Sequence, residues 1–361
     1  MNNNIKKISL EDLGFSTFFD SNRKALGLDN SSVARVVAEY KESYRVKNTN
    51  GEYLAKITGK QMFRALSRED YPAVGDWVTI TKLDTERAVI NSVLPRKTIL
   101  KRKYSSKSES QVIASNIDTA FLIESVDRDY NLNRFERYLA IAIEGKIKPV
   151  IVLNKIDLIS ESELNLKISQ IKNRFNGIEV IPTSTISDNG YSKLAAYIKK
   201  GETYCFLGSS GVGKSTLINR LLGENSIKTA SISHHTGRGK HTTSNREMYF
   251  LENGGMVIDN PGMRQVGMIE SNSGIDNVFD EITTLSAKCK FIDCAHEHEP
   301  GCAVRAAVEA GIVDENKYSN YVKLKKESEY YEMTKLEKRE KDRQFGKFIK
   351  KAKGQLKKRE F

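Results

Sequence analysis

The segment GSSGVGKST (208–216) carries the densest set of residues suited to chemistry. It matches G-x-x-x-x-G-K-[ST], in which glycines let backbone N–H groups curl around phosphate oxygens. We expect Lys214 to neutralise the β- and γ-phosphates during catalysis and the Ser215 hydroxyl to bind magnesium. An apolar strand pattern precedes the loop and a helical pattern follows it, as a nucleotide-binding loop requires. The residues expected to contact the nucleotide here are Gly208, Ser209, Ser210, Gly211, Val212, Gly213, Lys214, Ser215 and Thr216.

A second motif, NKID (154–157), follows the apolar run PVIVL and has the residues needed to read guanine. The Asp157 carboxylate can accept hydrogen bonds from guanine N1–H and from its exocyclic amine, a pair that adenine does not offer. Asn154 is expected to bond N7 or to tie loops together, and the Lys155 stem to pack on the base. Further along, PTSTIS (182–187) is expected to supply a backbone donor to guanine O6 near Ser184 and Thr185.

The segment DNPG (259–262) completes the expected GTP site. Asp259 would hold magnesium through water, and the Gly262 N–H would bond the γ-phosphate. Upstream, HHTGRGKHTTS (234–244) offers Thr242 or Thr243 as a further magnesium ligand, and Thr242 is the one we assign. The glycines and polar residues of this segment suit a loop that orders with GTP and loosens on hydrolysis.

The residue after Gly262 is Met263, where Ras-like GTPases place a glutamine that orients water. Intrinsic hydrolysis is therefore expected to be slow and to need a partner or another residue. His241 is the internal candidate for the catalytic role. A contact with a phosphate or another polyanion is the alternative for the same side chain.

The order of these motifs differs from that of an ordinary GTPase. The base-reading NKID and PTST segments precede the phosphate loop and DNPG. Because chain termini of compact domains often lie close together, a circular permutation is compatible with the same fold. We therefore predict a circularly permuted GTPase whose DNPG switch leads directly into the C-terminal part.

Three of the four cysteines lie within residues 289–302, in the pattern C-x4-C-x-H-x5-C. Three thiolates and one imidazole form a closed tetrahedral set for a structural zinc ion. The predicted ligands are Cys289, Cys294, His296 and Cys302, with His298 as the alternative imidazole. Cys205 lies in the strand that enters the phosphate loop and is expected in the core.

The 361-residue chain carries 58 Lys and Arg against 46 Asp and Glu, a formal net charge of +12. Residues 321–361 contain 15 basic and 7 acidic residues, and residues 96–107 contain six basic and no acidic ones. Segregated positive charge is typical of proteins that bind a polyanion. The first part of the tail mixes both charges at helical spacing, which also fits a solvated helix, whereas KFIKKAKGQLKKRE (347–360) favours RNA contact.

Several protein classes are excluded by composition. No apolar run approaches the roughly 18 residues that a membrane span needs, and the N-terminus lacks the apolar stretch of a signal peptide. Four cysteines without such a signal do not indicate a disulfide framework. We therefore expect a cytoplasmic protein with no membrane partner, and a monomer.

The elements that must position these residues form a multidomain chain. Five short β patterns between Val33 and Leu94 predict a small barrel, with the OB-fold as the natural candidate. We expect Trp77 in its core, with stacking on a nucleobase as the alternative. Strands then alternate with helices, which predicts a three-layer α/β domain. The expected divisions are an N-terminal extension (1–32), an OB-fold β-barrel (33–100), a linker (101–111), a circularly permuted P-loop GTPase domain (112–275) and a mostly α zinc-binding domain with a basic tail (276–361).

The combination of permuted GTP motifs, TGRGKHTT before DNPG, an N-terminal barrel and C-x4-C-x-H-x5-C resembles the bacterial ribosome small-subunit-dependent GTPases, the RsgA family. Asn260 departs slightly, since the family more often has Thr or Ser there. The resemblance implies an OB-fold that binds 16S rRNA, a GTPase activated by the 30S ribosomal subunit and a zinc domain that contacts the ribosome. It also implies a role in late maturation of that subunit, and it places His241 at the family's proposed catalytic histidine.

The expected activity is Mg²⁺-dependent hydrolysis of GTP to GDP and phosphate, with one structural Zn²⁺ ion. Two other classes stay open at this stage. A nucleic-acid-binding regulatory protein could have another RNA partner and a weak nucleotide switch, although the intact P-loop, NKID and DNPG argue against it. An ATP-dependent kinase could use the same P-loop.

Overall fold

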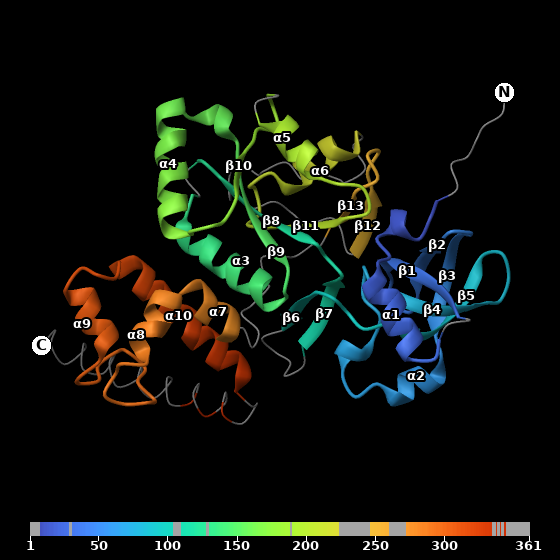
Figure 1. Cartoon of the computed structure of the whole chain (residues 1–361), viewed down its shortest axis with the longest axis horizontal. Coiled ribbons are helices and arrows are strands. Elements are labelled where there is room, and N and C mark those ends of the chain that lie inside the picture. Colours follow the sequence, from blue (N-terminus) through green and yellow to red (C-terminus); the bar gives the residue numbers. More distant parts are fainter. Residues whose placement is uncertain are drawn as a thin grey trace, which may run out of the picture.

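The computed structural model describes residues 8–28, 31–103, 110–127, 130–187, 190–223, 246–259 and 272–333, together with residues 337, 340 and 343. Figure 1 shows three parts: a β-barrel near the N-terminus, a central domain with helices around a sheet, and a group of C-terminal helices. The barrel and the C-terminal helices lie on opposite sides of the central domain.

The N-terminal part is a closed five-stranded barrel, as predicted. Its strands follow the order β1-β2-β3-β5-β4, and β4 pairs again with β1 to close the barrel. Alternate residues such as Val36, Val46 and Ile90 are fully buried inside it. The strands are β1 (Ser32–Glu39), β2 (Tyr44–Asn48), β3 (Gly51–Ile57), β4 (Trp77–Lys82) and β5 (Arg87–Val93), with helix α2 (Gly59–Arg64) between β3 and β4.

Helix α1 (Thr17–Ala25) belongs to the barrel as a packing element. Phe15 and Phe19 contact the Trp77 ring, with ring centroids 4.7 and 6.0 Å away. Trp77 is completely buried, so the prediction of a core position is confirmed. The N-terminal extension therefore covers a part of the barrel that would otherwise expose aromatic surface.

The central domain is a three-layer α/β structure, as predicted. Its sheet has the order β10-β9-β8-β11-β13-β12, parallel except for β12. Leu122 packs on one face and Phe121 on the other, the alternation that an extended strand imposes. The strands are β8 (Thr119–Ser125), β9 (Lys148–Asn154), β10 (Val180–Pro182), β11 (Thr203–Gly208), β12 (Arg246–Phe250) and β13 (Met256–Asp259).

Two pairs of helices cover this sheet. Phe135 of α3 and Ile171 of α4 belong to the core on the Leu122 face, whereas Leu194 of α5 and Leu217 of α6 pack on the Phe121 face. The helices are α3 (Leu132–Glu144), α4 (Glu161–Arg174), α5 (Tyr191–Tyr197) and α6 (Lys214–Leu222).

The segment predicted to be a linker, 101–111, contains strand residues at both of its ends. Strands β6 (Ile99–Lys103) and β7 (Ser110–Ser115) pair antiparallel, with Lys101 opposite Val112. Leu100 and Val112 are buried, and these apolar residues anchor the hairpin. The Ser- and Lys-rich composition of residues 101–111 hid this strand pairing, because the buried residues Leu100 and Val112 lie just outside the segment.

Barrel and central sheet are hydrogen-bonded to each other through β1 and β12, with Glu39 opposite Arg246. Arg35 of β1 is buried at this junction, where it donates to the carbonyls of Leu13, Gly75 and Asn116 and, at 2.8 Å, to Thr203 Oγ1. Burial lowers the pKa of Arg35 to about 10, which leaves the side chain charged at neutral pH.

The C-terminal helices are α7 (Asn272–Val278), α8 (Asp280–Ser286), α9 (Ala303–Glu309) and α10 (Glu315–Glu332). A polar contact joins α10 to the central domain. Buried Glu136 of α3 accepts from Arg174 Nε at 2.8 Å and from the Asn320 amide of α10. Arg137 and Glu327 form a second α3–α10 ion pair, 2.6 Å for the Nη1–Oε1 contact. Within the described parts of the chain, no helix is both long and apolar enough to cross a bilayer.

Candidate GTP site and Cys/His cluster

The phosphate-loop motif lies between the carboxyl end of β11 and the first turn of α6. Strand β11 is buried along its whole length between β8 and β13, so the loop starts from a rigid position. A Cβ at Gly208 would lie 2.3 Å from the Ile123 carbonyl oxygen of β8, so only glycine fits there. Ser209, Ser210 and Ser215 are half-buried in or beside the loop, while Gly211 and Thr216 are exposed.

Asn154 connects the base-reading motif to the phosphate loop. It is fully buried at the end of β9, and its Nδ2 donates to the Val212 carbonyl at 2.7 Å. Gly213 has φ +97°, and a Cβ there would come within 2.3 Å of Asn154 Nδ2. Glycine is therefore required at position 213 both by its backbone conformation and by the approach of Asn154. This contact ties the loop after β9 to the phosphate loop, one of the two roles expected for Asn154, and the bond to guanine N7 stays a prediction.

Lys214, the first residue of α6, folds back over the loop from which it starts. Its Nζ donates to the Gly208 carbonyl at 2.8 Å and also to the Ser209 carbonyl. From α3, the Tyr138 hydroxyl lies 3.4 Å from Ser209 Oγ. The ammonium group and the N-terminus of α6 thus share the phosphate loop, the arrangement that binds anions.

Asp157 and Lys155 are each held by a neighbour that the motif did not predict. The Ser184 hydroxyl donates to Asp157 Oδ1, which joins the two segments expected to read guanine. Lys155 has a left-handed backbone, φ +62°, and its Nζ lies 2.9 Å from Asp127 Oδ2. Asp127 also accepts from Ser125 at the end of β8. No sequence pattern marked Asp127, which follows a strand end by only two residues.

Asp259 is the last residue of β13, the strand beside β11, so it lies at the same edge of the sheet as the phosphate loop. Thr185 is half-buried in the loop after β10, next to buried Ser184. The other predicted residues of the GTP site, His241, Thr242, Thr243 and Gly262, lie outside the described residues.

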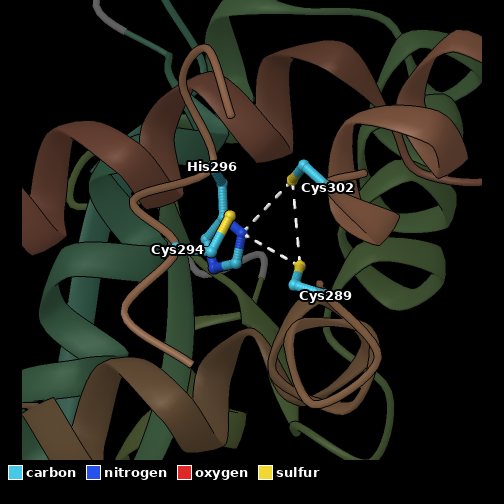
Figure 2. Close-up of side chains that lie close together, drawn as sticks. All are labelled: Cys289, Cys294, His296 and Cys302. Atoms are coloured by element: carbon cyan, nitrogen blue, oxygen red, sulfur yellow. Dashed lines mark hydrogen bonds between the residues drawn. The ribbon is translucent and has the colours of Figure 1, made fainter. Parts of the chain in front are cut away.

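Cys289, Cys294, His296 and Cys302 come together in the C-terminal part, with their ligand atoms all within 4.8 Å of one another. Figure 2 shows the four side chains converging on one point. His296 Nδ1 lies 3.4 Å from Cys302 Sγ and 3.6 Å from Cys289 Sγ. Three thiols and one imidazole at these separations form a set able to bind a structural zinc ion. The structure selects His296 over His298, which is not a member of the cluster.

The loop between Cys294 and Cys302 is shaped by backbone contacts. Glu299 accepts from the N–H groups of Ala295, Glu297 and His298 at 2.9 to 3.0 Å, and its own N–H together with these donors lowers the pKa of Glu299 to about 2. The Tyr318 hydroxyl of α10 donates to the His296 carbonyl at 2.6 Å. Cys302 caps α9, because its Sγ accepts from the Arg305 N–H. The fourth cysteine, Cys205, is buried in β11, and burial raises its pKa to about 12.

A P-loop at the centre of a mostly parallel sheet, with the NKID strand two positions away and earlier in the chain, defines a circularly permuted GTPase. The family model "RsgA GTPase" matches residues 93–269. A model described as ABC transporter matches residues 191–358, a range that contains the P-loop motif.

Curated relatives extend the likeness to most of the chain. "Small ribosomal subunit biogenesis GTPase RsgA 2" of Lactiplantibacillus plantarum is 41% identical over 82% of this chain and 84% of its own length. The protein of the same name from Listeria monocytogenes is 40% identical over 90% of each chain. The crystal structure of YjeQ from Thermotoga maritima aligns with a TM-score of 0.59 at 29% identity, covering 83% of this chain and 97% of that one.

The structure of YloQ, a circularly permuted GTPase, aligns with a TM-score of 0.55 at 23% identity and supports the fold alone. The chain belongs to the RsgA family of GTPases. It is an enzyme that hydrolyses GTP with Mg²⁺, and the predicted fold and cofactors are confirmed.

Proposed function

We propose that this GTPase binds the 30S ribosomal subunit, acts in its late maturation and is stimulated by it. The observation that carries the proposal is the likeness over about nine tenths of the chain to proteins named as small ribosomal subunit biogenesis GTPases. The likeness is accompanied by the whole set of parts: a barrel, a permuted GTP site and a Cys/His cluster. An isolated nucleotide switch would need neither of the flanking parts.

At the nucleotide, the structure supports a division of roles. Lys214 and the N-terminus of α6 would bind the β- and γ-phosphates, and Asp157 would accept from guanine. Ser215, Thr242 and, through water, Asp259 would hold magnesium, which when bound offsets charge on the phosphates. Thr243 is the alternative to Thr242. His241 would complete the catalytic site in place of the glutamine that Met263 replaces.

On the RNA side, we assign 16S rRNA contacts to the barrel and to the basic end of the chain, 347–360. Lys and Arg side chains there would neutralise backbone phosphates, so binding should weaken steeply as salt rises. We also propose that the protein acts as a monomer in the cytoplasm, where ribosomal subunits mature.

The test is GTP hydrolysis with and without purified 30S subunits. We expect the subunit to raise the rate by at least an order of magnitude and Lys214→Ala to abolish both rates. A variant that ends at residue 346 should keep its basal rate and lose 30S binding in a salt-dependent manner. If hydrolysis were indifferent to 30S subunits, the maturation role would be ruled out while the GTPase assignment remained.

A further inference from the structure

We propose that Arg220 is a positioning residue for guanine recognition, acting through the loop 183–187. This inference rests on the proposed role of that loop in binding guanine O6. Arg220 lies in the last turn of α6, the helix that begins at the phosphate loop. No motif includes it, and it lies too far along the helix to be counted with the phosphate-binding residues.

The guanidinium group of Arg220 holds the loop by two backbone carbonyls. Its Nη1 donates to the Ser184 oxygen at 3.1 Å and to the Ser187 oxygen at 2.9 Å. Between these carbonyls, the Ser184 hydroxyl accepts from the N–H groups of Ile186 and Ser187 at 3.1 and 3.2 Å. The same hydroxyl donates to Asp157. Arg220 therefore fixes the loop at the residue that also orients the guanine-reading carboxylate.

The guanidinium is itself held in place by Tyr191. Its central carbon lies 3.9 Å from the centroid of the Tyr191 ring, a close cation–π contact. The Tyr191 hydroxyl returns a hydrogen bond of 2.9 Å to the Arg220 carbonyl. Burial raises the pKa of Tyr191, so the hydroxyl stays protonated and able to donate. The pair thus ties the end of α6 to α5, and through Arg220 to the loop.

Such a link matters because, among the described residues, the sheet does not extend into the part of the loop after Thr183. Strand β10 ends at Pro182, so residues 184–187 lie beyond the sheet ladder, and Ile186 is largely exposed. Recognition of an oxygen requires donors placed to within a few tenths of an ångström. Arg220 supplies that precision because it couples the loop 183–187 to α6, the helix that begins at the phosphate loop.

The experiment compares binding of GDP, IDP and ADP to the full-length protein by calorimetry or fluorescent-nucleotide displacement. IDP keeps the oxygen at position 6 and lacks the 2-amino group that Asp157 is expected to read, whereas ADP has neither. In Arg220→Met, GDP and IDP should each bind about tenfold more weakly, as expected for the loss of charged hydrogen bonds. ADP affinity should stay within about twofold, because the phosphate loop remains intact. Arg220→Lys keeps the charge but loses the planar guanidinium, so its affinities for GDP and IDP should lie between those of wild type and Arg220→Met.

Controls separate this role from general damage. Arg87→Met removes an exposed arginine of the barrel, paired with Asp84, and should change no affinity. Tyr191→Phe removes only the hydroxyl and should lower the affinities for GDP and IDP by two- to threefold, with ADP affinity unchanged. This variant also tests the proposal if Arg220→Met does not fold. Equal weakening of all three nucleotides, or unchanged GDP binding, would overturn the proposal. A wild-type protein that binds ADP as tightly as GDP would instead refute the guanine site itself.

Discussion

At the scale of single residues, motif spacing predicted which side chains meet but not what holds them. NKID and PTSTIS indicated guanine recognition, and the structure brings Asp157 and Ser184 into hydrogen-bond contact. The contact of Lys155 with Asp127 could not be predicted from sequence. It depends on where a loop after β8 passes, and that path is set by tertiary packing rather than by local pattern.

The assigned role of Asp157 leads to a prediction about base preference. Asp157→Asn replaces a carboxylate that accepts two donors with an amide that also carries N–H groups. We expect GDP affinity to fall by about 10- to 100-fold, at about 1.4 kcal/mol for each factor of ten. XDP, whose base has an oxygen in place of the amine, should gain affinity. Nucleotide-binding calorimetry with both ligands provides the measurement.

Asp84→Asn is the matched control, because Asp84 belongs to an exposed barrel turn and should leave both affinities unchanged. A parallel loss of GDP and XDP binding in Asp157→Asn would contradict direct reading of the base by this carboxylate. It would indicate instead that the change disturbs the loop through Ser184.

At the scale of elements, strong periodicity made the barrel and the α/β domain predictable. Phe121 and Leu122 are consecutive apolar residues that pack on opposite faces of one sheet, so this strand can be read in the sequence as a continuous apolar run. The β6–β7 hairpin was missed because KRKYSSKSES has the composition of a loop. The packing of α10 on α3 could not be predicted from the sequence either, because it depends on the buried carboxylate of Glu136. Burial raises the pKa of Glu136 despite its contact with Arg174.

The Cys/His loop is an element whose order should depend on metal. Cys294→Ser replaces one of four soft ligands with a poor one, so zinc content should fall from about one ion per chain to well under half. The C-terminal part should then melt at a lower temperature than the rest. Elemental analysis of purified protein and calorimetric melting measure the two effects.

Cys205→Ala serves as the comparison, because that thiol lies in β11 and outside the cluster. It should keep full zinc content even if the central domain loses some stability. Equal zinc content in wild type, Cys294→Ser and Cys205→Ala would show that the four residues do not bind the metal.

At the scale of the whole molecule, barrel and GTPase are joined as one continuous sheet. Strand β1 pairs with β12, which pairs with β13, and β13 ends at Asp259 beside the phosphate loop. Ion pairs between Glu39 and Arg246 at 2.7 Å and between Arg45 and Glu247 at 3.2 Å flank the junction. A partner that binds the barrel would therefore contact a body that is continuous with the nucleotide site.

Arg35 is the residue on which this junction depends most. From a fully buried position it donates hydrogen bonds to Leu13 in the N-terminal segment, to Gly75 in a barrel turn, to Asn116 and to Thr203 of β11. Arg35→Met would leave several buried acceptors without a donor, at about 1–3 kcal/mol each. We expect the free energy of unfolding to fall by about 3 kcal/mol or more, with Arg35→Lys recovering only part of it.

Trp77 is the chain's only tryptophan, and its ring centroid lies 5.8 Å from the Arg35 guanidinium carbon, so its fluorescence reports on this junction. Urea unfolding followed by that signal should show the loss for Arg35→Met and none beyond about 0.5 kcal/mol for exposed Arg87→Met. Comparable small losses in the two variants would mean that the β1–β12 pairing and its flanking ion pairs hold the domains together without a large contribution from Arg35. A large loss confined to Arg35→Met would place the coupling in the buried guanidinium, which donates to the N-terminal segment, the barrel and strand β11 at once.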